Sequence, residues 1–410
     1  MPHFDADHDL RPHTPSLDTY LRRQAFLNAV GSTYAPLPGT FPTQVQSPSV
    51  WTGEDIDLEK LTYVLSANDL QEIREALEAF KRTAAAKHEI SSDTFKLPVL
   101  SRTLRKIAHE VNSGTGIGIV SGMEPDEYTV EDSIIIHAGI SAHVAPLRGC
   151  QSGSNDQIFH ICNREYMAVT DLRSNSTASA LPFHTDDTDI LAFYALETSS
   201  SGGEMLWASQ TQVYNELATD RPEVLGTLAK ADWPLQTAAD PPAYIEMPIM
   251  YNDSKGPYIW LAHGNLTGNA RSPRDTRLPP ISYEQADALD AVHFAAVKHA
   301  VAVAPQKGNF YFVNNFSVFH SRTAYHDDAE ETDAHPRGRR RHLLRLWIRD
   351  PLHGRDMQGR LAERWAHVFD KESANAGRWL LDREMDPTVI SQKLYAREYP
   401  ADTFNSCQNG

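Results

Sequence analysis

The sequence predicts an α+β fold: a double-stranded β-helix of the jelly-roll, cupin-like kind, flanked by α-helices. Short β-prone stretches recur through the middle of the chain, and helical periodicities flank them. Polar residues that suit one shared site stand at strand ends far apart in the sequence. With 410 residues, 41% of them hydrophobic, the chain can bury a substantial core.

Several segments have the apolar spacing of helices. In 69–81 the apolar residues recur at helical intervals, and Ser66 with Asp69 resembles a capping box at the start. A late segment beyond Met357 shows the same spacing. Further helices are predicted at 103–111, 130–137, 212–217, 222–228 and 283–301.

The strands are predicted from β-prone runs bounded by turn residues. The glycine-rich stretch 114–122 misses the GxGxxG spacing, and no long helix follows it, so a closely packed strand is favoured over a phosphate loop. The other predicted strands are 168–172, the segment around His184, 190–197, 205–208, 310–313 and 342–348.

Three regions follow from this pattern. Residues 1–50 are rich in Pro, Thr and Ser and are expected to be extended or mobile. Residues 51–352 would form the jelly-roll domain with its helices. Residues 353–410 would form a helical extension that packs on the same domain or on another subunit, which leaves a homo-oligomer open.

The bulk properties exclude some partners. A net charge of −16 disfavours general attraction to nucleic acid or to an anionic membrane. No apolar run approaches the roughly 20 residues that span a bilayer. The first 15 residues lack the pattern of a signal or transit peptide, and the three cysteines match no zinc spacing, so a cytoplasmic protein is expected.

The segment Pro182-Phe183-His184-Thr185-Asp186 carries the main chemical signal. Strand side chains alternate, so His184 and Asp186 project to one side, where they can grip one metal ion. Two histidines and one carboxylate form the facial triad that binds Fe(II) and leaves positions open. The third ligand is expected to be His320, which follows a strand and a turn, in preference to His326, His335 and His342.

An arginine-rich strand supplies a second signal. In 339–349 the alternation places Arg341, Arg345 and Trp347 on one side. A buried arginine needs an anion, and its planar fork suits a carboxylate. The alternative is that these arginines pair with the chain's own Asp and Glu.

Taken together, these motifs resemble the taurine dioxygenase-like (TauD/TfdA) family of Fe(II)- and 2-oxoglutarate-dependent oxygenases. The resemblance covers roughly residues 51–352 and includes the Gly202-Gly203 turn. It implies Fe(II), with 2-oxoglutarate and O2 as cosubstrates. It also implies that His184, Asp186 and His320 ligate the iron and that Arg341 grips the distal carboxylate of 2-oxoglutarate.

The same resemblance suggests further contacts. Arg345 matches a position that holds an anionic substrate group in some members. The family often has a hydroxyl residue just after the Gly-Gly turn, where this chain has Glu204 and Met205, so Ser209 or Thr211 is expected to replace it. Other candidate substrate contacts, which could instead be core residues, are Tyr194, Trp207, Asn315 and Trp347.

The function expected is oxidation of a C–H bond in a small, carboxylate-bearing molecule, with release of succinate and CO2. Hydroxylation, desaturation and cyclisation are not separated by the sequence, because they depend on fine placement of the substrate. Two alternatives remain: a non-catalytic jelly-roll binding protein, and a zinc hydrolase that uses the same triad.

Overall fold

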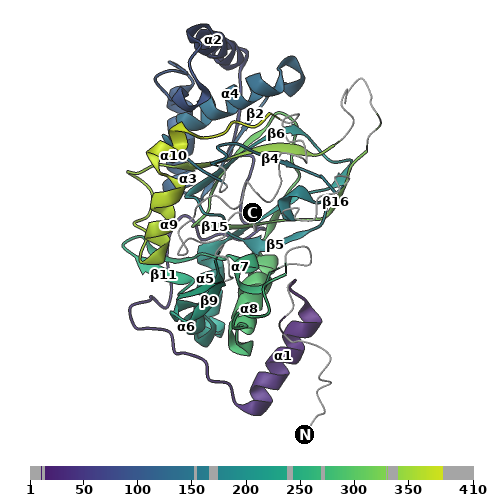
Figure 1. Cartoon of the computed structure of the whole chain (residues 1–410), viewed down its shortest axis with the longest axis vertical. Helices are drawn as coiled ribbons and strands as arrows, with labels where there is room; N and C mark the ends of the chain where they lie inside the picture. The colour runs from purple at the N-terminus through teal and green to yellow at the C-terminus, as the bar shows by residue number, and fades with distance from the viewer. Residues whose placement is uncertain are drawn as a thin grey trace.

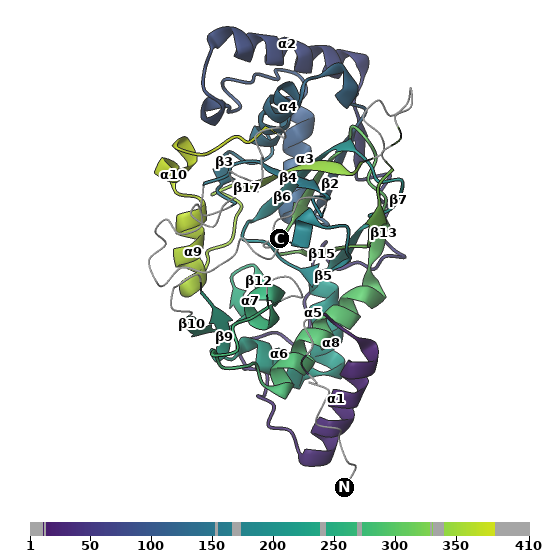
Figure 2. The ribbon, with the colours of Figure 1, turned by 45° about the vertical axis from the view of Figure 1, so that its right-hand side comes forward.

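Two β-sheets lie face to face, and each is covered by helices on its outer side (Figures 1 and 2). The computed structural model describes residues 11, 14–151, 155–165, 174–237, 243–268, 273–328, 330 and 340–381. The predicted α+β jelly roll is confirmed. The strand predicted at 168–172 lies outside the described residues.

The larger sheet has seven strands, and the smaller has four. All pairings are antiparallel except that of β1 with β2. The larger sheet runs in the order β1 (Thr62–Val64), β2 (Ile117–Ser121), β14 (Phe310–Asn314), β6 (Ile190–Glu197), β17 (His342–Arg349) and β3 (Leu147–Gly149), with β4 (Phe159–Cys162) also paired to β17. The smaller runs in the order β13 (Val301–Val303), β8 (Met205–Ser209), β15 (Val318–Arg322) and β5 (Leu181–His184). Two-stranded ribbons pair β7 (Ser201–Gly202) with β16 (Tyr325–His326), β9 (Trp233–Gln236) with β10 (Tyr244–Met247), and β11 (Met250–Asp253) with β12 (Gly256–Ile259).

Helices cover both outer faces. One group packs against the larger sheet: α2 (Ala67–Thr83) and α4 (Val130–Ala142), at the top of Figure 1, and α3 (Ser101–Ser113) below them. The other packs against the smaller sheet: α5 (Gln210–Asp220), α6 (Pro222–Ala229) and α8 (Tyr283–His299). The Ser66–Asp69 capping box predicted for α2 is present. The shorter helices are α7 (His263–Thr267), α9 (Arg360–Val368) and α10 (Lys371–Asn375).

The sequence did not reveal the first helix, α1 (Leu17–Val30), which lies within the segment expected to be extended. Its buried side chains are Thr19, Arg23 and Leu27, and Arg23 is paired with Asp290 of α8. Two of these three buried residues are polar, so the helix has no clear apolar stripe. It is held by an ion pair and by packing that only the folded chain brings together.

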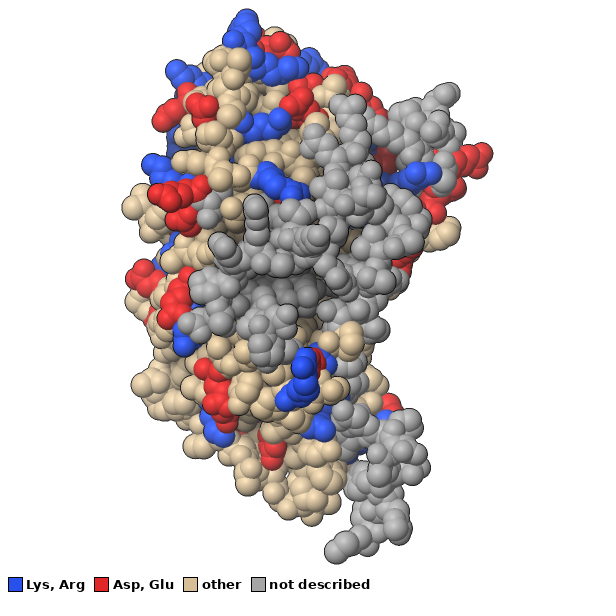
Figure 3. Space-filling model, viewed as in Figure 1, with Lys and Arg blue, Asp and Glu red and all other residues tan. Residues whose placement is uncertain are grey.

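The described surface mixes charges of both signs. On the face in Figure 3, basic and acidic side chains alternate, and those that are described form no continuous basic strip. Within the described part of the chain, every helix is too short or too polar to cross a membrane.

One buried histidine ties α4 to the larger sheet and makes stability depend on pH. His137 is fully buried, and its Nε2 pairs with the Ala192 carbonyl of β6 at 3.2 Å. Burial lowers the pKa of His137 from 6.5 to about 3, so the unfolded chain binds a proton in that range while the folded chain does not. The stability that comes from keeping His137 neutral is therefore fully present above the ordinary histidine pKa, and it is lost as the pH falls below that value.

We predict that His137→Gln reduces the acid sensitivity of the fold. Between about pH 7 and about pH 5, the free energy of unfolding of the unsubstituted protein should fall by roughly 2 kcal/mol more than that of the variant. Denaturant unfolding at both pH values measures this. The control is His326→Gln, at an exposed position. Equal pH dependence in His137→Gln and the unsubstituted protein would contradict the prediction.

Candidate metal centre and its cavity

Three side chains predicted as ligands meet between the two sheets. His184, Asp186 and His320 offer ligand atoms that all lie within 4.8 Å of one another. The sheet register explains the meeting, because His320 on β15 stands directly opposite His184 on the antiparallel strand β5. The Nε2 atoms of His184 and His320 lie 3.7 Å and 3.8 Å from Oδ1 of Asp186. This donor set fits Fe(II).

The two carboxylate oxygens of Asp186 have different partners. Its Oδ1 faces the histidines, while Oδ2 accepts hydrogen bonds from Arg345 Nη1 at 2.8 Å and Trp347 Nε1 at 3.0 Å. Burial on its own would raise the pKa of Asp186, but the charge of Arg345 outweighs it, and the pKa is lowered. The carboxylate is therefore ionised at neutral pH, with one oxygen turned toward the metal position.

Both histidines are suited to metal binding at neutral pH. Burial lowers the pKa of His184 and that of His320, so each ring is neutral. Nδ1 of His184 lies 2.9 Å from the Pro182 carbonyl. A proton on Nδ1 satisfies that carbonyl and leaves the Nε2 lone pair for a metal ion.

The turn after Asp186 is fixed by Asn315. The Asn315 side chain accepts from the Asp186 backbone N–H at 2.9 Å and donates to the carbonyls of Asp186 and Thr188 at 2.6 Å and 2.9 Å. Two further acidic residues of this turn also have partners: Asp187 pairs with Trp260 and Arg364, and Asp189 with Trp365 and Arg349.

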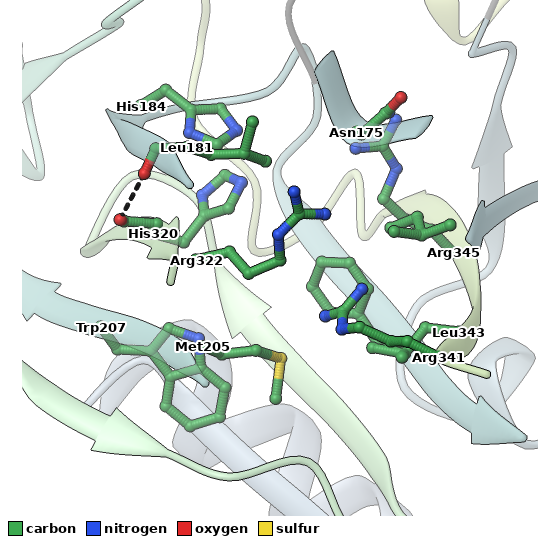
Figure 4. A pocket seen from close by; sticks show the side chains of 13 residues that line it. Asn175, Leu181, His184, Met205, Trp207, His320, Arg322, Arg341, Leu343 and Arg345 are labelled. Atoms are coloured by element: carbon green, nitrogen blue, oxygen red, sulfur yellow. Dashed lines mark hydrogen bonds between the residues drawn. The ribbon is translucent and has the colours of Figure 1, made fainter. Parts of the chain in front are cut away.

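A small cavity lies beside the triad, and its lining includes His184, His320, Arg341 and Arg345. Figure 4 shows His184 and His320 on one side of it and Arg341 on another. Arg341 is 3% exposed, and its Nε and Nη1 have no hydrogen-bond partner among the described residues. Gly203 allows this placement, since a Cβ there would lie 3.3 Å from Arg341 Nε, at a φ of +80° that disfavours side chains.

The structure places some predicted substrate contacts elsewhere. Arg345 lines the cavity, but its Nη1 and Nε donate to Asp186 and Gln151. Trp347 donates to the carboxylate of Asp186, and Asn315 donates to its backbone carbonyl, so both hold the predicted metal ligand in place. Of the aromatic candidates, only Trp207 is among the described residues that line the cavity.

Three other candidates lie away from the cavity. Tyr194 points to the helix side of the larger sheet, where its ring stacks on Phe310 at 4.1 Å, because alternation along β6 turns Phe193 inward instead. The hydroxyls of Ser209 and Thr211, expected near the cosubstrate, both bond to Ser49. The structure does not bring them to the triad.

Several cavity residues were not predicted from the sequence, among them Arg322 and Asn175. Arg322 stands two residues after His320 on β15, so strand alternation alone could have placed it beside the triad. Asn175 has no comparable signal, because it lies in the short helix η3 (Ser174–Ser176), outside any strand pattern. Within the described structure, neither amide atom of Asn175 has a hydrogen-bond partner, although the residue is 2% exposed.

The sequence matches the "Taurine catabolism dioxygenase TauD, TfdA family" over residues 80–347. It is also 30% identical to the taurine hydroxylase-like protein SAT17 of Stachybotrys chartarum, over 83% of this chain and 89% of that protein. The chain belongs to this family. It is therefore an Fe(II)- and 2-oxoglutarate-dependent dioxygenase, and the residues of the triad fit that metal.

Two further relatives agree with the family and with the fold. FR-33289 synthase of Streptomyces rubellomurinus is 26% identical, over 74% of this chain and 90% of that protein. A solved asparagine oxygenase, in complex with Fe(II), 3-hydroxyasparagine and succinate, superimposes with a TM-score of 0.53 at 14% identity, over 72% of this chain and 98% of that one. The match to the asparagine oxygenase structure shows a shared fold.

We predict that Asn315→Ala lowers Fe(II) affinity by roughly 10- to 100-fold, because the turn that orients Asp186 loses its clamp. Anaerobic Fe(II) titration of the folded variant measures this. The matched control is Asn215→Ala. Asn215 is also buried, and its side chain also bonds to backbone, to the N–H and the carbonyl of Val45. Normal Fe(II) affinity with a raised substrate KM would instead make Asn315 a substrate contact.

Proposed function

We propose that His184, Asp186 and His320 bind the Fe(II), that Arg341 binds the distal carboxylate of 2-oxoglutarate, and that the protein oxidises a C–H bond of a small molecule. One observation carries this proposal: two histidines of the triad line the same cavity as a buried arginine whose Nε and Nη1 have no partner among the described residues. A buried guanidinium without an anion is costly, and a carboxylate matches its fork.

The chain's own residues have separate tasks in this scheme. Arg345 and Trp347 hold Oδ2 of Asp186, so Oδ1 alone is offered to the metal. Arg341 sets the direction in which the cosubstrate lies. The apolar walls, which include Phe193, Met205 and Trp207, exclude water from the reacting atoms. Bound iron, with O2 and 2-oxoglutarate, would supply the oxidation: O2 is the oxidant, and 2-oxoglutarate loses CO2 and is released as succinate.

The substrate we propose is a small molecule that reaches the triad through this cavity. The expectation of a carboxylate on the substrate depended on Arg345, and that side chain is engaged with Asp186 and Gln151. A substrate acid group would therefore need another partner. Asn175, whose amide is unpaired among the described residues, is our candidate for a polar substrate contact. Hydroxylation, desaturation and cyclisation all fit this arrangement.

Anaerobic addition of Fe(II) and 2-oxoglutarate to metal-free protein should produce a weak visible charge-transfer band that needs both. We predict that His184→Ala abolishes the band and that Arg341→Ala raises the 2-oxoglutarate concentration needed by at least about tenfold, since a charge-assisted contact is lost.

The matched controls are His326→Ala and Arg340→Gln, two exposed positions where the band should be unchanged. Absence of a band from folded, unsubstituted protein would overturn the proposed site. A band that persists in His184→Ala would remove that residue from the ligand set.

A further inference from the structure

A second arginine, Arg322, points into the same cavity. Figure 4 shows its side chain between the two ligand histidines and Arg341. Arg322 is 4% exposed, and its Nη2 donates to the carbonyls of Thr177 and Ser179. Its Nε and Nη1 have no partner among the residues that the structure describes. One side of this guanidinium is thus bonded to backbone, and the other side has no partner in the described part of the chain.

Arg322 and Arg341 share one surface. The guanidinium carbons of Arg322 and Arg341 lie 4.9 Å and 5.3 Å from the ring centre of Tyr325. A guanidinium stays protonated in proteins at neutral pH, so both arginines carry a positive charge.

Two like charges inside one cavity require an anion. No acidic residue is among the described residues that line the cavity. Asp327 and Glu165, the acids that act on Arg322, lie outside this lining, and Asp327 accepts the backbone N–H of Arg341. Asp186 is already matched by Arg345. The positive charge of Arg322 and Arg341 therefore remains for a ligand.

The position of Arg322 favours the cosubstrate as this ligand. Arg322 lies between the triad and Arg341, along the line that a molecule held by both would follow. Ser321 is the hydroxyl residue of the described lining, and its Oγ donates to the Leu181 carbonyl, while Met205 lines the wall and Ser209 and Thr211 bond to Ser49. The hydroxyls that might have assisted Arg341 are therefore engaged elsewhere.

We propose that Arg322 is a second cation that binds the distal carboxylate of 2-oxoglutarate, together with Arg341. This inference depends on the proposed function, because it assigns a further residue to the same cosubstrate. It makes the cavity selective for 2-oxo acids with two carboxylates.

The test compares two 2-oxo acids of equal chain length, 2-oxoglutarate and 2-oxopentanoate, which lacks the distal carboxylate. Anaerobic binding to the Fe(II)-loaded protein is measured for the unsubstituted chain, Arg322→Gln, Arg322→Lys and the exposed control Arg340→Gln. Arg322→Gln should weaken 2-oxoglutarate binding by at least about tenfold and leave 2-oxopentanoate binding unchanged. Arg322→Lys should recover part of the loss, and Arg340→Gln should behave as the unsubstituted chain.

Two results would overturn the inference. Equal losses for both acids would mean that Arg322 only supports the fold. Unchanged 2-oxoglutarate affinity would exclude Arg322 from the cosubstrate site. An anionic group of the substrate would then be the remaining candidate partner for Arg322. A missing charge-transfer band in the unsubstituted protein is a different result, because it contradicts the proposed function itself.

A structure of the unsubstituted protein with Fe(II) and 2-oxoglutarate tests the same contact if the Arg322 variants do not fold. Hydrogen bonds from Arg322 to the distal carboxylate would support the proposal. A distal carboxylate bound only by Arg341 would overturn it.

Discussion

The rest of the site depends on the Asp186 carboxylate, whose two oxygens face different partners. A carboxylate that is 4% exposed must be neutralised, and β17 supplies Arg345 and Trp347 to one of its oxygens. The other oxygen is then directed at the two histidines. Since β17 is paired with β6 in the larger sheet while His184 and His320 come from the smaller one, the site exists only when both sheets are packed together.

The charges of the residues around Asp186 determine which ligands suit the cavity. Asp186 and Arg345 balance each other's charge, so Arg341 and Arg322 leave the described lining of the cavity positive, and a bound metal ion would add to that charge. An anion with two carboxylates, one at the metal and one at the arginines, fits that field better than a neutral molecule does. The net charge of −16 over the whole chain therefore says little about this cavity, where the sign is reversed.

The alternation of side chains along a strand predicts which residues of that strand point to the same face. The prediction that His184 and Asp186 lie together is confirmed, although β5 ends at His184 and Asp186 lies beyond the strand; alternation along β17 and the residue before it does place Arg341 and Arg345 at one cavity. It could not tell which face of a two-sided strand meets the cavity, and Tyr194 faces the helices for that reason. Hydrogen bonds across long sequence separations, such as that of Asn315 to Asp186, follow from tertiary packing and leave no local signal.

The ligand turn is held by the protein before any metal binds. Asp187 and Asp189 are tied to α9 through Arg364 and Trp365, and Asn315 fixes the backbone between them and Asp186. These partners come from segments far from the turn in sequence, so the site is fixed by the whole fold. Because Asp186 already has its counter-charge, metal binding need not reorganise the carboxylate. The helix α9 thereby helps to keep the proposed metal ligand Asp186 in place.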